Sequence, residues 1–476
     1  MGVDSQLVCD RLYATATLTI VFAMSAPLGQ TIVMKFGGTS VADAERIKRA
    51  AGRIVRAHED GNRVVAVLSA RGKTTDELLA MAQEVSERPD PREMDMLLST
   101  GERISCALAA MVINDLGHQA ISLTGSQAGI VTDTSHTKAR ILDVRADRIR
   151  AALDEGKVVL VAGFQGVSTS YDVTTLGRGG SDTTAVALAA ALGADVCEIY
   201  TDVSGVYSAD PRIVPEARKL RFVSFEEMLE MAASGAKVLQ LRSVEYARNH
   251  GVRIHCRSSF NDSPGTVVLG EDDTVEQPLI TAVTHSTDEA RVTLLGVPDQ
   301  PGVAGRIFSA LADDNINVDM IIQNEPESDG ARADMSFTVP RADLAGATRT
   351  LGRIVAELGI ARVATDVEMG KVSIVGAGMK SHPGVAAKVF SVLGENAINM
   401  EMISTSPIKI SCVIRGEHVP RAVRALHAAF ELGRDSVREE RPFASSPRDG
   451  DGDGAAGEDV PYKDLPPEGS SGEEAA

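Results

Sequence analysis

The feature that most restricts how this chain folds is an internal repeat in its last third. The segment RVTLLGVPDQPGVAGRIFSALADDNINVDMI begins at Arg291, and KVSIVGAGMKSHPGVAAKVFSVLGENAINMEMI begins at Lys371. Their Pro-Gly pairs begin at Pro301 and Pro383, an offset of 82 residues. From the Pro-Gly pair onward the match keeps this offset, as Asn317 and Asn399 show, which indicates a tandem duplication, so this region must fold as two copies of one small unit.

Each copy of the repeat follows the same order of expected elements. A strand is followed by the Pro-Gly turn, a helix and another strand; a further strand and helix are expected at 335–339 and 344–357 in the first copy. This alternation is typical of a ferredoxin-like unit.

A different pattern occupies residues 31–269. Short apolar runs alternate with longer amphipathic stretches, which predicts an α/β fold with a mainly parallel sheet between helical layers. Helices are expected at 44–58 and 225–249, with ends near Gly61 and Gly251. A Gly/Asp-rich break at 265–277 precedes the repeat. The expected strands are 31–36, 63–69, 120–123, 158–162, 196–200 and 252–256.

Length and charge set further limits. A chain of 476 residues predicts two or three domains. Apolar residues make up 43% and charged residues 24%, which excludes disordered and membrane classes. A formal net charge of -18 argues against a nucleic acid or an anionic membrane as the main partner.

The cysteines and the two ends of the chain suggest a cytosolic protein. The five cysteines lack CxxC spacing, which is typical of reduced thiols and indicates no metal site. The apolar segment 12–28 resembles a signal peptide, but Asp4 and Asp10 precede it against one Arg11. We interpret residues 1–30 as a disordered extension or an over-long start, with Met24 or Met34 as alternative initiators. Residues 441–476 are expected to form an acidic disordered tail.

Three clusters carry candidate chemistry, and the first is the segment 35–40. Gly37 and Gly38 let backbone N–H groups approach an anion where a strand ends and a helix begins, and Lys35 supplies a positive charge for a phosphate. Because the lysine precedes the glycines, this is not a Walker A loop. The alternative interpretation is a tight turn.

The second cluster is 176–184, which precedes the Ala-rich helix expected at 185–192. Arg178 is flanked by Gly177, Gly179 and Gly180, so a backbone nest lies beside a guanidinium group. That combination suits a substrate with a carboxylate. The alternative is a capped helix after a flexible loop.

The third cluster, 201–212, follows the strand expected to begin at Val196. Ligands of open parallel sheets gather at the carboxyl ends of the strands, so this loop is well placed for a nucleotide. The alternative is a pair of turns at Ser204-Gly205 and Asp210-Pro211. Lys237 and Glu102, taken singly, would be typical of solvated helix ends.

Six segments in order resemble one family. KFGGTSV, SARGKTTDELL, STGERIS, TLGRGGSDTTA, YTDVSGVYSADPR and SGAKVL are similar to the aspartate kinases of the amino-acid kinase family, over about residues 31–435. Glutamate 5-kinase, acetylglutamate kinase and uridylate kinase share that fold but not this set. The repeat resembles the paired ACT domains of aspartate kinases. The resemblance implies a catalytic domain at 31–269, a linker with a first regulatory strand at 270–290, and ACT domains at 291–366 and 371–435.

The resemblance also implies a reaction. ATP with Mg²⁺ would phosphorylate L-aspartate to 4-phospho-L-aspartate, the first step of lysine, threonine and methionine biosynthesis. Lys35 and Asp182 match catalytic positions. The ATP-binding positions are Lys35, Phe36, Gly37, Gly38, Thr201, Asp202, Tyr207, Asp210, Arg212, Lys237 and Val238. The substrate-binding positions are Ser40, Thr75, Glu102, Arg178, Gly179, Gly180 and Ser181.

Elementary chemistry agrees with these roles. A side-chain carboxylate has a pKa of about 4 and is already ionised at pH 7, so it needs no general base. Catalysis must then depend on alignment and on neutralising phosphoryl charge with Lys35, Lys237 and Mg²⁺. Asp182 would orient the lysine and the substrate ammonium.

For the repeat, the resemblance implies that lysine and threonine are effectors and that the first unit is inserted within the second, whose opening strand lies within 279–287. The protein would form a homo-oligomer or assemble with a shorter regulatory subunit from the same gene. No Met lies between Met231 and Met320, so that subunit would need a non-ATG start. The implied effector positions are Asp299, Gly302, Val303, Ala304, Asn317, Asp319, Gln323, Val385, Ala386, Asn399, Met400 and Ser406.

Two other functions stay open. A kinase for another acidic amino acid, such as glutamate, differs by one methylene, which is worth only about 1–3 kcal/mol in binding. A non-catalytic amino-acid sensor would have no use for a phosphate site made by Lys35, Arg178, Asp182 and Lys237.

Overall fold

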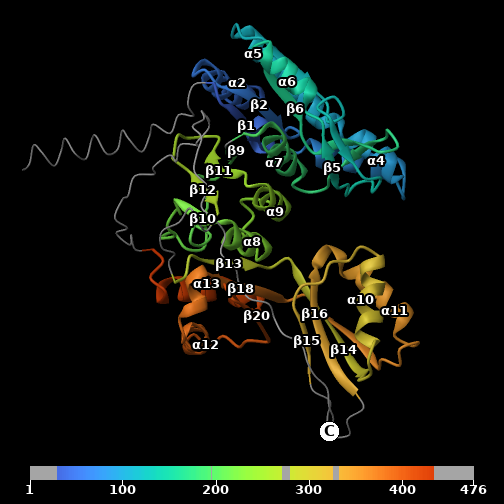
Figure 1. The fold of residues 1–476 in the computed structure, drawn as a ribbon. Helices are drawn as coiled ribbons and strands as arrows, with labels where there is room; N and C mark the ends of the chain where they lie inside the picture. Colours follow the sequence, from blue (N-terminus) through green and yellow to red (C-terminus); the bar gives the residue numbers. More distant parts are fainter. Residues whose placement is uncertain (1–28, 195, 271–278, 325–331, 434–476) are drawn as a thin grey trace, which may run out of the picture. The chain divides into compact units, whose positions relative to one another are not determined.

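The computed structural model describes residues 29–194, 196–270, 279–324 and 332–433 (Figure 1). Most of the predicted N-terminal extension, up to residue 28, and the whole predicted acidic tail lie outside these residues.

The region before the repeat is built on one eight-stranded sheet. Its strand order is β10-β12-β11-β9-β1-β2-β6-β3, and every neighbouring pair is parallel except β11 with β12. The six strands expected from the sequence are all present, within two residues at each end. The strands are β1 (Thr31–Phe36), β2 (Arg63–Leu68), β3 (Ala120–Leu123), β6 (Val158–Ala162), β9 (Val196–Thr201), β10 (Phe222–Ser224), β11 (Arg253–Ser258) and β12 (Thr266–Leu269).

Helices cover both faces of this sheet because successive strand residues point to opposite sides. Met34 and Phe36 pack in one core with α2 (Ala44–Glu59) and α5 (Thr100–Asp115). Val33 packs in the other core with α6 (Asp147–Asp154), α7 (Gly180–Leu192), α8 (Phe225–Ala233) and α9 (Leu241–His250). The predicted parallel sheet between helical layers is therefore confirmed.

A smaller four-stranded sheet accompanies the main one. Its order is β5-β4-β7-β8, formed by β4 (Ile130–Thr132), β5 (Ile141–Val144), β7 (Gln165–Ser168) and β8 (Val173–Thr175). Helix α4 (Pro91–Leu98) packs on β8, and α3 (Thr74–Val85) packs on α4. The strands of this sheet are only three or four residues long.

The repeat forms two four-stranded sheets, each with two helices. One has the order β15-β16-β14-β17, from β14 (Glu289–Pro298), β15 (Ile321–Gln323), β16 (Arg332–Pro340) and β17 (Arg362–Asp366), with α10 (Val303–Asp313) and α11 (Leu344–Ile354). The other has the order β13-β18-β20-β19, from β13 (Ala282–Ser286), β18 (Met369–Val375), β19 (Met402–Ser406) and β20 (Lys409–Arg415), with α12 (Val385–Glu395) and α13 (Val419–Ala429). Short 3₁₀ helices are η1 (Gly38–Val41), η3 (Arg341–Asp343), η4 (Ala377–Ser381) and η5 (Gly416–His418).

Strand pairing confirms the insertion of one unit within the other. β13 lies inside the expected segment 279–287 and pairs antiparallel with β18, so the whole first unit falls between two strands of one sheet. The two Pro-Gly turns are equivalent, because Gly302 and Gly384 have φ of 92° and 95° and begin α10 and α12. Only glycine adopts this conformation without strain.

The single helix expected at 225–249 is wrong: the structure has α8 and α9, separated by residues 234–240. Gly235 has φ of 106°, and a Cβ there would lie 1.9 Å from the carbonyl oxygen of His285. The backbone of β13 therefore packs where a continuous helix would place a side chain.

The stretch Pro91–Asp115, which contains α4 and α5, is by length and composition the one described segment apolar enough to cross a membrane, but half of its most apolar window is buried. Cys106, Ala109 and Ile113 face the sheet in the core that includes β1. The stretch is thus explained as a core helix. Within the described residues Cys106, Cys197, Cys256 and Cys412 are buried free thiols, as the spacing predicts.

Candidate active site

Lys35 and Asp182 meet at the carboxyl end of the central strand. Lys35 is the fifth residue of β1, Asp182 lies in the first turn of α7, and Nζ lies 2.5 Å from Oδ1. Their side chains are only 12% and 8% exposed. Two opposite charges held with so little solvent interact strongly, and the first turn of a helix favours the carboxylate. The structure therefore unites the two predicted catalytic residues.

Of the two glycines after Lys35, Gly38 has a steric reason for being glycine. A Cβ on Gly38 would lie 2.8 Å from the carbonyl oxygen of Ala70, and one on Gly37 would lie 3.5 Å from Lys35 Nζ. The backbone thus runs directly beside the ammonium group, as an anion-binding turn requires. Phe36 itself is fully buried and stacks on Tyr200, with ring centroids 4.7 Å apart. Its side chain belongs to the core.

Glu102 is buried near the same turn. It is 3% exposed, and its Oε1 accepts a hydrogen bond of 3.1 Å from the backbone N–H of Ala70. Its Oε2 has no partner among the described residues. Burial raises the pKa of Glu102 to about 7. The solvated helix end is therefore the wrong interpretation: this carboxylate is held inside the protein with one acceptor oxygen available.

The loop 177–181 connects β8 to α7. Gly177 and Gly179 have φ of 77° and 73°, a conformation that disfavours side chains. Arg178 between them is exposed and makes no hydrogen bond or ion pair with any described residue. Ser181 is 7% exposed and packs on Gly163, where a Cβ would lie 2.7 Å from Ser181 Oγ. Gly163 was missed in the sequence, although a glycine directly after β6 was a usable signal.

Two further predicted substrate positions lie apart from this loop. Ser40 is buried, and its Oγ lies 2.6 Å from Ser259 Oγ at the end of β11. This hydrogen bond ties η1 to the residue that follows β11. Thr75 lies half-buried at the start of α3.

The predicted nucleotide positions follow β9 and α8. β1 and β9 are parallel neighbours, with Phe36 opposite Tyr200. Thr201, the last residue of β9, therefore lies beside the glycine turn that follows β1. Thr201 Oγ1 donates a 3.0 Å hydrogen bond to Asp202, and Tyr207 forms a bridge with Lys219.

Three charged nucleotide positions are occupied by partners within the protein. Asp210 and Arg212 form an ion pair of 2.7 Å, and its hydrogen bonds lower the pKa of Asp210. Arg212 is 89% exposed. Lys237 pairs with Asp288, and both are exposed, whereas Val238 packs partly buried against the core. No contact of Arg212 or Lys237 with the Lys35–Asp182 pair is present in the described residues.

Predicted effector positions show three contacts of their own. Gln323 Nε2 donates a 3.4 Å hydrogen bond to Asp299 Oδ1, which unites two of them. Lys371, buried in β18, pairs with Asp319 at 2.6 Å and so links β18 to the segment that precedes β15.

Ser406 contacts the region that contains the main sheet. Its Oγ donates a 3.1 Å hydrogen bond to Glu230 of α8, and Lys409 pairs with the same glutamate at 2.8 Å. The remaining positions include the exposed Asn317 and Asn399 and the half-buried Val303, Ala304, Ala386 and Met400, while Val385 is buried.

Comparison with known proteins agrees with this architecture. The family model described as the amino acid kinase family matches residues 30–258, and the model described as an ACT domain matches residues 292–353 and 372–430. An aspartokinase of Mycolicibacterium smegmatis is 57% identical over 407 residues, covering 85% of this chain and 97% of the relative.

Two solved structures are similar in fold. Aspartokinase III of E. coli in complex with aspartate and ADP has a TM-score of 0.73 and 27% identity, covering 84% of this chain and 99% of that chain. The E. coli enzyme in complex with lysine and aspartate has a TM-score of 0.66 and 28% identity, with the same coverage.

Proposed function

The chain belongs to the aspartokinases, phosphotransferases of the amino acid kinase family, and on that premise we propose that it transfers the γ-phosphate of ATP to the side-chain carboxylate of L-aspartate, giving 4-phospho-L-aspartate. The observation that carries this proposal is the ion pair between Lys35 and Asp182 at the carboxyl end of β1. It supplies a fixed, poorly solvated cation beside a glycine turn, which is what a transferring phosphoryl group requires.

In the proposed mechanism Lys35 neutralises charge that develops on the phosphoryl oxygens. Asp182 holds Nζ at 2.5 Å, so little rearrangement is needed during transfer. The acceptor carboxylate is already ionised, so no residue is assigned to remove a proton from it.

Glu102 and Arg178 are proposed to bind the two α-substituents of aspartate. The unpartnered Oε2 of Glu102 is an acceptor for the ammonium group, and pairing with that cation would favour the ionised carboxylate. The exposed guanidinium of Arg178 is a planar donor for the α-carboxylate. Ser181, Thr75, Ser40 and the glycines of loop 177–181 complete the proposed substrate site.

ATP is proposed to bind beside β9, along residues 201–212 and 237–238. Arg212 and Lys237 would exchange their present partners, Asp210 and Asp288, for phosphates; both are exposed enough to do so. Mg²⁺ would be held chiefly by the phosphates, because no group of three acidic, His or Cys side chains suited to a metal occurs among the described residues. When bound, the ion supplies charge neutralisation between the phosphates.

The ACT region is proposed to mediate feedback inhibition by lysine and threonine, as the end products of the pathway that this reaction would begin. The E. coli relative has been crystallised with lysine. The contact of Ser406 with Glu230 supports communication between the two regions, because Ser406 is a predicted effector position and α8 is followed by the proposed nucleotide positions 237–238. We further propose a homo-oligomer, or an assembly with a shorter regulatory subunit, in the cytoplasm.

A coupled assay of ADP release tests the proposed acceptor. With aspartate, release should be well above that seen with no acceptor, and glutamate should be a poor substitute. Equal rates of ADP release with glutamate would favour the alternative function, a kinase for another acidic amino acid. ADP release no higher with an acceptor than without one would favour a non-catalytic amino-acid sensor.

A further inference from the structure

We propose that Asp95, on α4, is a positioning residue for the loop 177–181 and thereby for aspartate binding. This inference rests on the proposed role of that loop in holding the substrate. Asp95 itself is assigned no contact with substrate or nucleotide; it acts through the two chain segments that carry the loop.

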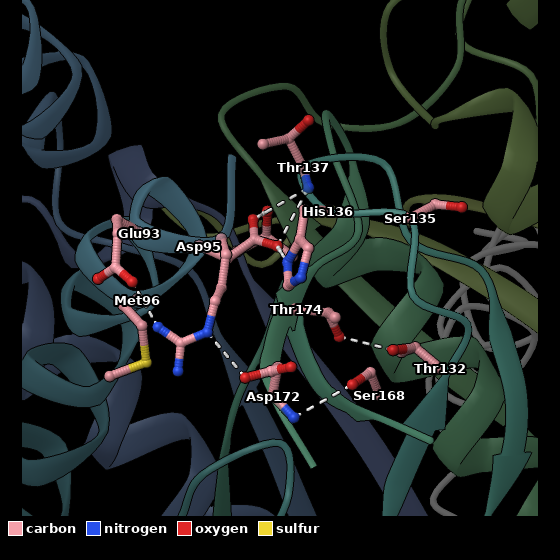
Figure 2. Close-up of polar contacts among 12 residues, drawn as sticks. Glu93, Asp95, Met96, Thr132, Ser135, His136, Thr137, Ser168, Asp172 and Thr174 are labelled. Atoms are coloured by element: carbon pink, nitrogen blue, oxygen red, sulfur yellow. Dashed lines mark hydrogen bonds and ion pairs between the residues drawn. The ribbon is translucent and has the colours of Figure 1, made fainter. Parts of the chain in front are cut away.

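Asp95 is a fully buried carboxylate with a complete set of donors. It is 0% exposed, and its Oδ2 lies 2.7 Å from His136 Nδ1. The backbone N–H of Thr137 lies 3.1 Å from both oxygens, and Thr175 Oγ1 donates a hydrogen bond of 2.5 Å to Oδ1. Figure 2 shows the ring of His136 and the backbone of Thr137 facing this carboxylate. A charge buried so deeply is tolerated only when it is paired in this way.

The donors lie on two segments that are distant in sequence. Thr175 ends β8, two residues before Gly177. Thr137 lies in the loop between β4 and β5 and has φ of 66°, a conformation that a β-branched residue adopts only under constraint. Asp95 supplies that constraint, because it accepts the hydrogen bond from the Thr137 N–H.

The loop bearing Thr137 packs directly on the start of the substrate loop. A Cβ on Gly177 would lie 3.2 Å from the carbonyl oxygen of Thr137. The backbone N–H of Ala139 donates a 2.9 Å hydrogen bond to the carbonyl of Thr175. A shift of the Thr137 segment would therefore move Gly177 as well.

A second residue, Arg242, joins the same segments. Arg242 of α9 donates to the carbonyl oxygen of Leu176 at 3.0 Å and to that of Ala139 at 2.9 Å. Asp95 on α4 and Arg242 on α9 thus hold the two segments together just before loop 177–181 begins.

These anchors matter because Arg178 itself has none. Arg178 is exposed without a described partner and is flanked by Gly177 and Gly179, the most flexible neighbours available. The position of its guanidinium therefore depends on the position of the backbone on each side. A misplacement of about 1 Å in a binding group can cost about 100-fold in rate, so the anchors should affect substrate binding.

The test compares steady-state constants and calorimetric aspartate binding for full-length Asp95→Ala, Asp95→Asn and Thr175→Val. Asp95→Ala should raise the aspartate KM about tenfold or more while the ATP KM changes by less than about threefold. Asp95→Asn should recover most of the affinity, because an amide can still accept from Thr175 or Thr137. Glu93→Gln is the matched control: Glu93 is an exposed carboxylate on the same helix that pairs with its neighbour Arg92 and not with the two segments, so both KM values should stay within about twofold.

An unchanged aspartate KM in folded Asp95→Ala, equal rises in both KM values, or no recovery in Asp95→Asn would overturn the inference. If Asp95→Ala does not fold, Thr175→Val decides: a raised aspartate KM supports the inference and an unchanged one overturns it. Arg178→Ala is measured in parallel. If that variant binds aspartate normally, the proposed substrate site itself is wrong; if it alone loses affinity, only the role of Asp95 is wrong.

Discussion

Lys35 near the end of β1 and Asp182 in the first turn of α7 form an ion pair, with Nζ and Oδ1 2.5 Å apart. The ammonium group is thereby held beside Gly37, in a site where both side chains are almost out of solvent. Such a preorganised cation is effective because it needs no reorientation when charge develops.

Lys35→Ala should therefore lower kcat by about two orders of magnitude or more while the protein stays folded. Thermal unfolding and steady-state kinetics check both parts. Lys48→Ala is the matched control, because Lys48 is an exposed lysine on α2 whose pairing with Glu45 is of the kind that contributes little. Near-normal turnover in a folded Lys35→Ala would contradict the assigned role.

Glu102 should make aspartate binding depend on pH. Burial raises the pKa of Glu102 to about 7, and only the ionised carboxylate can pair with the substrate ammonium. kcat/KM for aspartate should therefore fall as the pH decreases through about 7, and Glu102→Gln should have a lower and flatter profile. An unchanged profile in Glu102→Gln would exclude this pairing.

The same carboxylate should make the folded protein less stable as the pH rises, although kcat/KM for aspartate increases over the same range. A folded-state pKa raised from 4.5 to about 7 means that the native protein binds the extra proton, so this contribution is fully present below pH 4.5 and is lost as the pH rises through 7. Glu102→Gln should reduce the decline in the free energy of unfolding across that interval. Denaturant unfolding at pH 5 and pH 8 measures the difference; an identical decline in both proteins would contradict it.

Arg178 and Arg212 should give opposite kinetic signatures. Arg178→Ala should raise the aspartate KM far more than the ATP KM, because its guanidinium is assigned to the substrate carboxylate. Arg212→Ala should mainly raise the ATP KM, since Arg212 is exposed and free to exchange Asp210 for a phosphate. Matching effects of the two variants would invalidate the division between substrate and nucleotide sides.

Asp299→Ala should relieve inhibition by lysine and threonine while kcat and the aspartate KM stay within about twofold without effector. Asp299 accepts a hydrogen bond from Gln323, so the variant removes one carboxylate from the proposed effector site. Asp313→Ala, at the exposed end of α10, serves as control and should stay inhibited. Full inhibition of Asp299→Ala, or no response of the wild type to either amino acid, would contradict the regulatory proposal.

The main sheet could be predicted from the sequence because its buried strands are continuous apolar runs bounded by turn residues, as at β1 and β6. The small sheet could not, since strands such as β4 and β8 have three residues, too few to show a period. The break between α8 and α9 was also out of reach. It depends on the contact of Gly235 with His285, which no local pattern reveals.

Site residues follow the same division. The glycine turns at Gly37 and in loop 177–181 were evident because close backbone approach leaves a local sequence signal. Asp95 was not, and Glu102 could be assigned only through the family resemblance, since each looks like a polar residue on an amphipathic helix and only tertiary contacts bury it. The partners of Asp95, at His136 and Thr175, lie on other elements.

The most direct measurement of the central claim is product trapping with hydroxylamine, which converts an acyl phosphate into a hydroxamate. Purified protein with ATP, Mg²⁺ and L-aspartate should form aspartyl hydroxamate in proportion to ADP released. In Lys35→Ala, hydroxamate formation and ADP release should both decrease. ADP release without hydroxamate, or hydroxamate formed as readily from glutamate, would contradict the assignment of this chain as an aspartate side-chain kinase.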